Sequence, residues 1–258
     1  LAVRGTNVEV RIAEGNRDQA LTKLRELSQP LGGILGTSGQ RSVEVSDAGE
    51  GLIRLTVPQP AITERIRQSV EQSIQIVERR VNELGTVEPL IQRQGLDRIL
   101  VQVPGLQDPT RLKELLGKTA KLDFRMVDVN TSPDQAAAGR VPPESEILQS
   151  AQAPKQPYVI EKRVLVSGGD LTDAQPGFDQ RSGEPIVSFR FNTSGARKFA
   201  QATQENVGRP FAIVLDNEVI SAPVIREPII GGSGQISGGF TVEQANDLAI
   251  LLRAGALP

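Results

Sequence analysis

The chain has 258 residues, with 29 Lys and Arg against 31 Asp and Glu, and it contains no Cys and no His. A formal net charge of −2 and an aromatic content of 3% argue against a nucleic-acid-binding protein, which needs a basic surface and, for single strands, aromatic side chains that stack on bases. The lack of Cys and His excludes disulfides, thiolate nucleophiles, Ser-His-Asp catalysis and zinc sites built from His or Cys.

The first 59 residues predict a small α/β extension at the N-terminus. Residues 8–12 and 41–46 alternate polar and apolar side chains as strands do. Residues 17–27 carry apolar side chains at helical spacing, and residues 30–39 form a glycine-rich connector.

The next part of the chain follows the element order of a ferredoxin-like unit. Strand, helix, strand, strand, helix and strand are predicted in turn at residues 51–58, 61–84, 86–94, 98–105, 109–117 and 121–129. This order is that of a split βαβ fold, in which the four strands form one sheet. The first helix has an apolar residue every third or fourth position and ends at Gly85, and Asp108 is the predicted N-cap of the second.

Composition changes after Asp128. Residues 130–157 are rich in Pro, Ala, Gln and Ser and predict a linker that contains at most a short helix. Beyond them the pattern predicts a strand, a turn-rich excursion, a strand, a helix capped by Thr193 or Ser194, a hairpin and a final helix, at residues 158–166, 168–184, 185–191, 193–208, 211–225 and 241–255. The whole is an α+β protein.

Carboxylates at the predicted hairpin are the first candidates for chemistry. Asp216, Asn217 and Glu218 separate two apolar runs, and such residues dominate two-residue turns, so we favour a turn with a solvated tip over a reaction centre. The alternative is a carboxylate hydrolase. It would need two carboxylates to converge in a desolvated cleft, and the candidates are Asp170, Asp173, Asp216 and Glu218. No cofactor or metal site is predicted.

Three separated segments carry a family resemblance. Residues 78–128 ("ERRVNELGTVEPLIQRQGLDRILVQVPGLQDPTRLKELLGKTAKLDFRMVD"), 191–225 and 238–258 closely resemble, in the same order, the first large periplasmic region of SecD. The resemblance implies a ferredoxin-like base at 60–128, an inserted α+β head at 129–238 and a return helix at 239–258 that packs on the base. Hinges between base and head are then expected at Asp128, Val129, Gly238 and Gly239.

The resemblance also implies a function. The chain is expected to lie on the periplasmic side of the bacterial inner membrane and to hold or guide preproteins that emerge from SecYEG, with SecF and YajC as further partners and proton-driven movement in the full SecDF complex. No apolar run reaches the roughly 20 residues of a membrane-spanning helix, so we expect a soluble piece cut from a longer protein whose membrane helices lie elsewhere.

Four apolar residues of the head are candidates for contact with an unfolded chain. A head that grips many sequences needs exposed apolar surface, and the prolines in residues 221–232 prevent a fully buried central strand. We therefore predict contact at Val224, Ile225, Ile229 and Ile230, with a role in the core as the alternative for each. A periplasmic porter domain of a proton-driven efflux transporter is the alternative for the whole chain, and a closed apolar cavity in the head would favour it.

Overall fold

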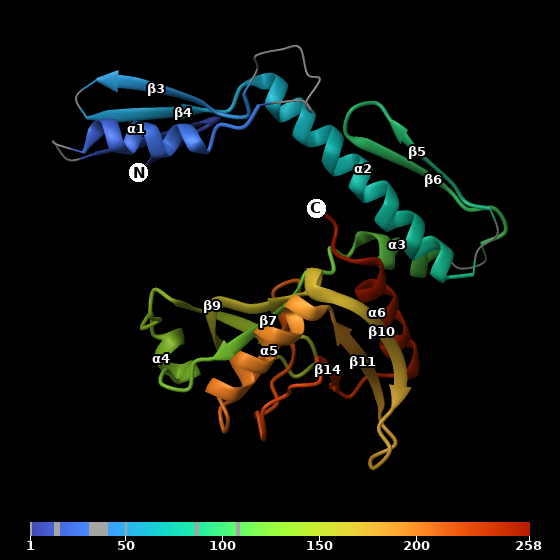
Figure 1. Ribbon diagram of the computed structural model, residues 1–258. Helices are drawn as coiled ribbons and strands as arrows, with labels where there is room; N and C mark the ends of the chain where they lie inside the picture. The colour runs from blue at the N-terminus through green and yellow to red at the C-terminus, as the bar shows by residue number, and fades with distance from the viewer. Residues whose placement is uncertain (1, 13–15, 31–40, 50, 86–87, 107–108) are drawn as a thin grey trace. The chain divides into compact units, whose positions relative to one another are not determined.

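The computed structural model describes residues 2–12, 16–30, 41–49, 51–85, 88–106 and 109–258 (Figure 1). Nearly all of the predicted glycine-rich connector and the predicted N-cap Asp108 lie outside these ranges. The chain divides into two compact units, the first formed by Leu1–Ile74 with Gln92–Leu100 and the second by Gln75–Ile91 with Val101–Pro258. No helix in the described residues is both long and apolar enough to cross a membrane.

The N-terminal part of unit 1 is a four-stranded antiparallel sheet of order β1-β2-β4-β3 with one short helix. Its elements are β1 (Ala2–Arg4), β2 (Asn7–Arg11), α1 (Arg17–Glu26), β3 (Glu44–Gly49) and β4 (Leu52–Thr56). The predicted strands and helix are confirmed, and β1 was missed because three residues are too few to show an alternation. Ile53 and Leu55 of the central strand β4 supply the buried apolar side chains of the sheet.

A long helix and a hairpin follow. The predicted helix is confirmed as α2 (Gln59–Glu83), and Gly85 after it has the positive φ of +71° that ends a helix in the left-handed conformation. The predicted hairpin is also confirmed, as the two-stranded sheet of β5 (Leu90–Gln94) and β6 (Arg98–Gln102).

Unit 2 contains a closed five-stranded barrel of order β12-β13-β8-β9-β7. The strands are β7 (Leu122–Val127), β8 (Ser145–Ser150), β9 (Pro157–Ser167), β12 (Phe211–Leu215) and β13 (Glu218–Ser221), and all pairs are antiparallel except β13 with β8. The short helix predicted within the linker at 130–157 is found as α4 (Pro133–Ala137), but the prediction is wrong over β8, a strand that it did not include. β8 was missed because this six-residue strand is surrounded by residues rich in Pro, Ala, Gln and Ser.

A second sheet of unit 2, of order β10-β11-β14, packs beside the barrel with helices on it. Its elements are β10 (Leu171–Phe178), β11 (Pro185–Phe191) and β14 (Ser233–Ile236). Besides α4 and the end of α2, unit 2 contains the helices α3 (Pro109–Gly117), α5 (Thr193–Glu205) and α6 (Val242–Ala254). α6 runs along β10 and β11 (Figure 1). The prediction of a turn-rich excursion at 168–184 is therefore wrong for Leu171–Phe178, which form the strand β10. Pro176 is tolerated there because β10 is an edge strand.

Helix ends in unit 2 are largely as predicted. Thr241 and Gln244 form the predicted capping box of α6, and Gly255 follows that helix with a φ of +90°. The N-cap of α5 is Asn192 rather than Thr193 or Ser194, because the Asn192 side chain accepts the Gly195 N–H at 2.8 Å.

Phenylalanines hold the barrel and the second sheet together in one core. Five of the seven Phe residues meet with ring centroids 5.1–6.4 Å apart, mostly tilted or edge to face, and these are Phe124, Phe189, Phe191, Phe199 and Phe211. Such pairs add to the burial of the rings. Phe124 lies in the predicted base and the others in the predicted head, so residues of both share this core.

The prediction of a single ferredoxin-like sheet is not confirmed. Its four strands lie in three sheets: β4 pairs with β2 and β3, β5 with β6, and β7 with β9 and β12. Both edges of β7 and both edges of β4 are therefore occupied by other strands. α6, predicted to pack on the base, contacts Leu115 and Ala120 there through Leu251, but most of its buried side chains join the phenylalanine core. The predicted limits at 59, 128 and 238 stay predictions.

Candidate functional site

The hairpin turn between β12 and β13 is the turn that the sequence predicts. Asp216 and Asn217 have φ angles of +49° and +66°, as a two-residue hairpin turn requires. The Asp216 carboxylate, however, does not sit at a solvated tip. It is half-buried and accepts the backbone N–H groups of Ala120 and Lys121, each at 2.9 Å. Asp216 thereby ties the hairpin to the loop between α3 and β7, where Ala120 has a φ of +61°.

Arg80 is a fully buried cation at the last turn of α2. Its guanidinium donates to the carbonyls at the ends of α3 and α6, namely Leu115 at 2.8 Å, Lys118 at 2.6 Å, Thr119 at 3.2 Å and Gly255 at 3.1 Å. Burial lowers the pKa of Arg80, and the nearby negative charge of Asp216 opposes that shift. Arg80 therefore joins three helix ends, although the periodicity of α2 places it among the polar side chains.

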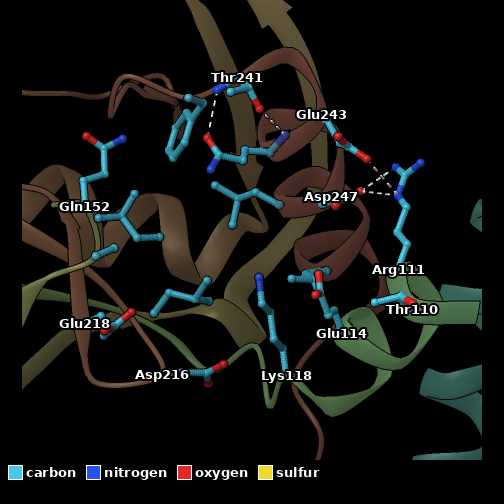
Figure 2. Close-up of a pocket in the computed structure, with 17 residues that line it drawn as sticks. Thr110, Arg111, Glu114, Lys118, Gln152, Asp216, Glu218, Thr241, Glu243 and Asp247 are labelled. Carbon is cyan, nitrogen blue, oxygen red and sulfur yellow. Dashed lines mark hydrogen bonds and ion pairs between the residues drawn. The ribbon is translucent and has the colours of Figure 1, made fainter.

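A cavity of about 760 Å³ opens beside this junction. It lies between α3, the β12–β13 hairpin and the first turns of α6 (Figure 2). Its apolar side is formed by Leu215, Ile220, Phe240, Leu248 and Leu251, and its charged side chains are Arg111, Glu114, Lys118, Asp216, Glu218, Glu243 and Asp247. A cavity with so many charges is not the closed apolar pocket that would favour a small-molecule porter.

Most of the carboxylates named above have a partner. Arg111 contacts Asp247 at 2.5 Å and Glu243 at 3.7 Å (Figure 2), and Lys155 contacts Glu218 at 2.6 Å. These pairs hold α3 to α6 and the hairpin to the loop after β8. They use the carboxylates for structure rather than leaving two of them free to share a proton.

The four candidate hydrolase carboxylates do not all lie in one site, and the two that share the cavity, Asp216 and Glu218, each have a separate partner. Asp216 and Glu218 line the cavity, whereas Asp170 pairs with Lys198 at 3.0 Å and Asp173 accepts from Gln175 at 3.0 Å outside it. Within the described residues, no group of three or more acidic side chains is arranged to hold a metal ion. The geometry therefore gives no support for carboxylate catalysis.

The four predicted polypeptide-contact residues divide into two pairs. Ile225 is 2% exposed and Ile229 is partly buried, and both pack on the phenylalanine core. Val224 is 53% exposed and Ile230 is 79% exposed. Val224 and Ile230 are thus available at the surface, while the alternative of a core role describes Ile225 and Ile229.

The predicted hinge residues have different surroundings. Asp128 accepts the Asn130 N–H at 2.9 Å and the Ser145 hydroxyl at 3.1 Å; although burial acts against it, these hydrogen bonds hold the pKa of Asp128 below its usual value. Val129 is exposed. Gly239 has a φ of +60°, and a Cβ on Gly238 would lie 3.0 Å from the Phe240 ring. A hinge role for these four residues stays a prediction.

Comparison with protein families matches two parts of the chain. Residues 145–258 match the model described as SecDF, P1 head subdomain, and residues 70–129 match the model described as protein translocase subunit SecDF, P1 domain, N-terminal. A solved structure titled "Structure and function of a membrane component SecDF that enhances protein export" is 38% identical with a TM-score of 0.59, over 74% of this chain and 89% of that one. This chain belongs to the SecDF family.

Relatives of the SecDF family extend the match to nearly the whole chain. SecD of Rickettsia bellii is 49% identical over 213 residues, which are 82% of this chain and 41% of the relative. SecD of Rhodobacter capsulatus is 45% identical over 254 residues, which are 97% of this chain and 45% of the relative. The chain therefore spans less than half the length of these curated relatives. They are named protein translocase subunits, so the family resemblance is confirmed and the efflux alternative is not favoured.

Proposed function

We propose that this chain is the periplasmic P1 region of a SecD subunit and that it holds unfolded preproteins as they leave the SecYEG channel. In this proposal SecF, SecYEG and YajC are partners, the membrane is the bacterial inner membrane, and proton-driven movement of the full SecDF complex promotes the late part of translocation. The membership of the chain in the SecDF family, over both parts of P1, is the observation that carries the proposal.

Exposed apolar side chains supply the contact in this proposal. A protein that holds chains of many sequences gains from apolar surface that makes few specific demands on its partner. Val224 and Ile230 are exposed by 53% and 79% and lie six positions apart, within the part that matches the head model. Both therefore have apolar area to bury against an unfolded chain.

The experiment measures binding of this chain to a reduced, carboxymethylated secretory protein by fluorescence anisotropy. We expect the double variant Val224→Ser, Ile230→Ser to bind about tenfold more weakly, since burying part of two apolar side chains contributes on the order of 1–2 kcal/mol. Val242→Ser is the matched control, because Val242 is 61% exposed at the start of α6 and is not a predicted contact. Equal affinity of the double variant and the natural chain would remove Val224 and Ile230 from the proposal.

Point variants are preferable to deleting the predicted head at 129–238. That deletion would remove β9 and β12, which are the two neighbours of β7 in the barrel. It would also remove most of the phenylalanine core, so loss of binding would report unfolding. Association with the partners is tested by co-purification of full-length SecD carrying the same substitutions.

A further inference from the structure

The two sheets of unit 2 differ in whether they have free strand edges. The barrel is closed, so its five strands leave no free edge. The sheet β10-β11-β14 is open and has two outer strands, β10 and β14. An unpaired outer strand presents N–H and C=O groups that can pair with another chain, and natural proteins usually block such edges.

The outer edge of β10 is partly blocked. The Asp179 N–H donates to the Glu184 carbonyl at 2.9 Å, so these two residues form a hydrogen-bonded pair of the β10–β11 ladder. Hydrogen-bonded and non-hydrogen-bonded pairs alternate along an antiparallel ladder, and this register directs the backbone groups of Ala174 and Pro176 away from β11. The Ala174 carbonyl accepts a hydrogen bond of 2.7 Å from Arg253 of α6, and Pro176 has no N–H to donate. An added strand would therefore find two of the outward backbone positions at Ala174 and Pro176 unavailable on this side.

The outer edge of β14 has none of these protections. The Phe191 N–H donates to the Gly232 carbonyl at 2.8 Å, which sets the alternation and directs the backbone groups of Ser233 and Gln235 away from β11. Within the described part of the chain these groups have no hydrogen-bond partner, and both residues are exposed. β14 contains no proline and no charged side chain.

We propose that the outer edge of β14 binds an extended segment of unfolded polypeptide by adding it as a fourth strand of the sheet β10-β11-β14. This inference rests on the proposed function and specifies how the chain is held. Pairing through N–H and C=O groups is independent of the side chains of the partner, so one edge can accept many sequences. The bound segment therefore needs no particular amino-acid composition.

The surroundings of β14 suit an added strand. Ile230, 79% exposed, lies three residues before β14 and offers apolar contact at one end. A hollow of about 560 Å³ lies on the sheet along Ser233, Gly234 and Gln235, and Ile229 forms part of its wall. This hollow gives room for side chains of the partner on that face of the sheet.

Residue-resolved hydrogen exchange of the natural chain, free and with the reduced, carboxymethylated secretory protein, is the direct test. The amides of Ser233 and Gln235 should exchange at least about tenfold more slowly in the complex, because each gains a backbone hydrogen bond. The amides of Gly234 and Ile236, which already face β11, should be protected in both states. Alternating protection distinguishes strand pairing from general coverage of the surface.

A pair of variants at one position tests the same contact by affinity. Gln235→Pro removes an N–H that makes no bond to β11 and should weaken binding about fivefold to tenfold, whereas Gln235→Ala keeps that N–H and should change binding less than about twofold. Binding without slower exchange at Ser233 and Gln235 would overturn the edge pairing and leave the proposed function standing. No binding by the natural chain would overturn the proposed function, and this inference with it.

Discussion

Replacing Arg80 by Met tests whether the buried guanidinium holds unit 2 together. The substitution keeps most of the aliphatic volume but removes the donors to four carbonyls, those of Leu115, Lys118, Thr119 and Gly255. An unpaired buried carbonyl costs about 1–3 kcal/mol, and relief of the desolvation of Arg80 offsets part of that cost. If about half of the carbonyls recruit water, the free energy of unfolding should fall by about 3–5 kcal/mol.

Urea unfolding, followed by tyrosine fluorescence, measures the loss of stability in unit 2. The chain has one Tyr and no Trp, and Tyr158 lies in β9 of the barrel. Arg79→Met is the matched control, because Arg79 is the preceding residue of α2 and is exposed. We expect the control to change stability by less than about 0.5 kcal/mol. If the Arg80→Met and Arg79→Met variants unfold at the same urea concentration, the junction does not carry the stability assigned to it here.

Two further variants probe backbone packing and acid stability. Gly195→Ala should destabilise unit 2 by about 1–3 kcal/mol, because the added Cβ would lie 2.6 Å from the Cβ of Asp170. Gly117→Ala is the control and should not destabilise the unit, because nothing would lie within 4 Å of its added Cβ. Thermal unfolding of the two variants tests this difference. The pKa of Asp128 is lower in the folded chain, so its contribution is present above about pH 4 and is lost as pH falls through the folded value. Urea titrations should therefore show the natural chain losing its advantage over Asp128→Asn across that range, and an advantage that persists at lower pH would contradict the assignment.

Local structure could be read from the sequence because its causes are local. The apolar stripe of α2, the capping box of Thr241 and Gln244, and the Asp216-Asn217 turn each depend on residues a few positions apart. All three are found in the structure as predicted. The same holds for the strand at β7, where Leu122, Phe124 and Met126 are buried.

Partners far away in the chain could not be predicted. The pattern of β7 indicates a strand but not that β9 and β12 pair with it, and this non-local choice separates a barrel from a ferredoxin-like sheet. Asp216 accepts hydrogen bonds from residues 95 and 96 positions before it, and Arg80 donates to Gly255, 175 positions after it. For the predicted contacts, hydrophobicity did not separate exposed Ile230 from buried Ile225, because both are Ile in one proline-interrupted run.

The partly blocked and the open edge of the second sheet are connected to different parts of unit 2. Arg253 partly blocks β10 and also contacts Glu83 at 2.5 Å, so the protection of that edge belongs to the same helix junction that Arg80 holds. Among the described strands β14 pairs only with β11; its Ile236 is buried in the phenylalanine core, and the exposed Ile230 precedes it. In the proposed complex, an added strand would pair with outward backbone groups of β14 that take no part in the contacts joining α2, α3 and α6, so the junction at Arg80 would stay intact when a chain binds or leaves.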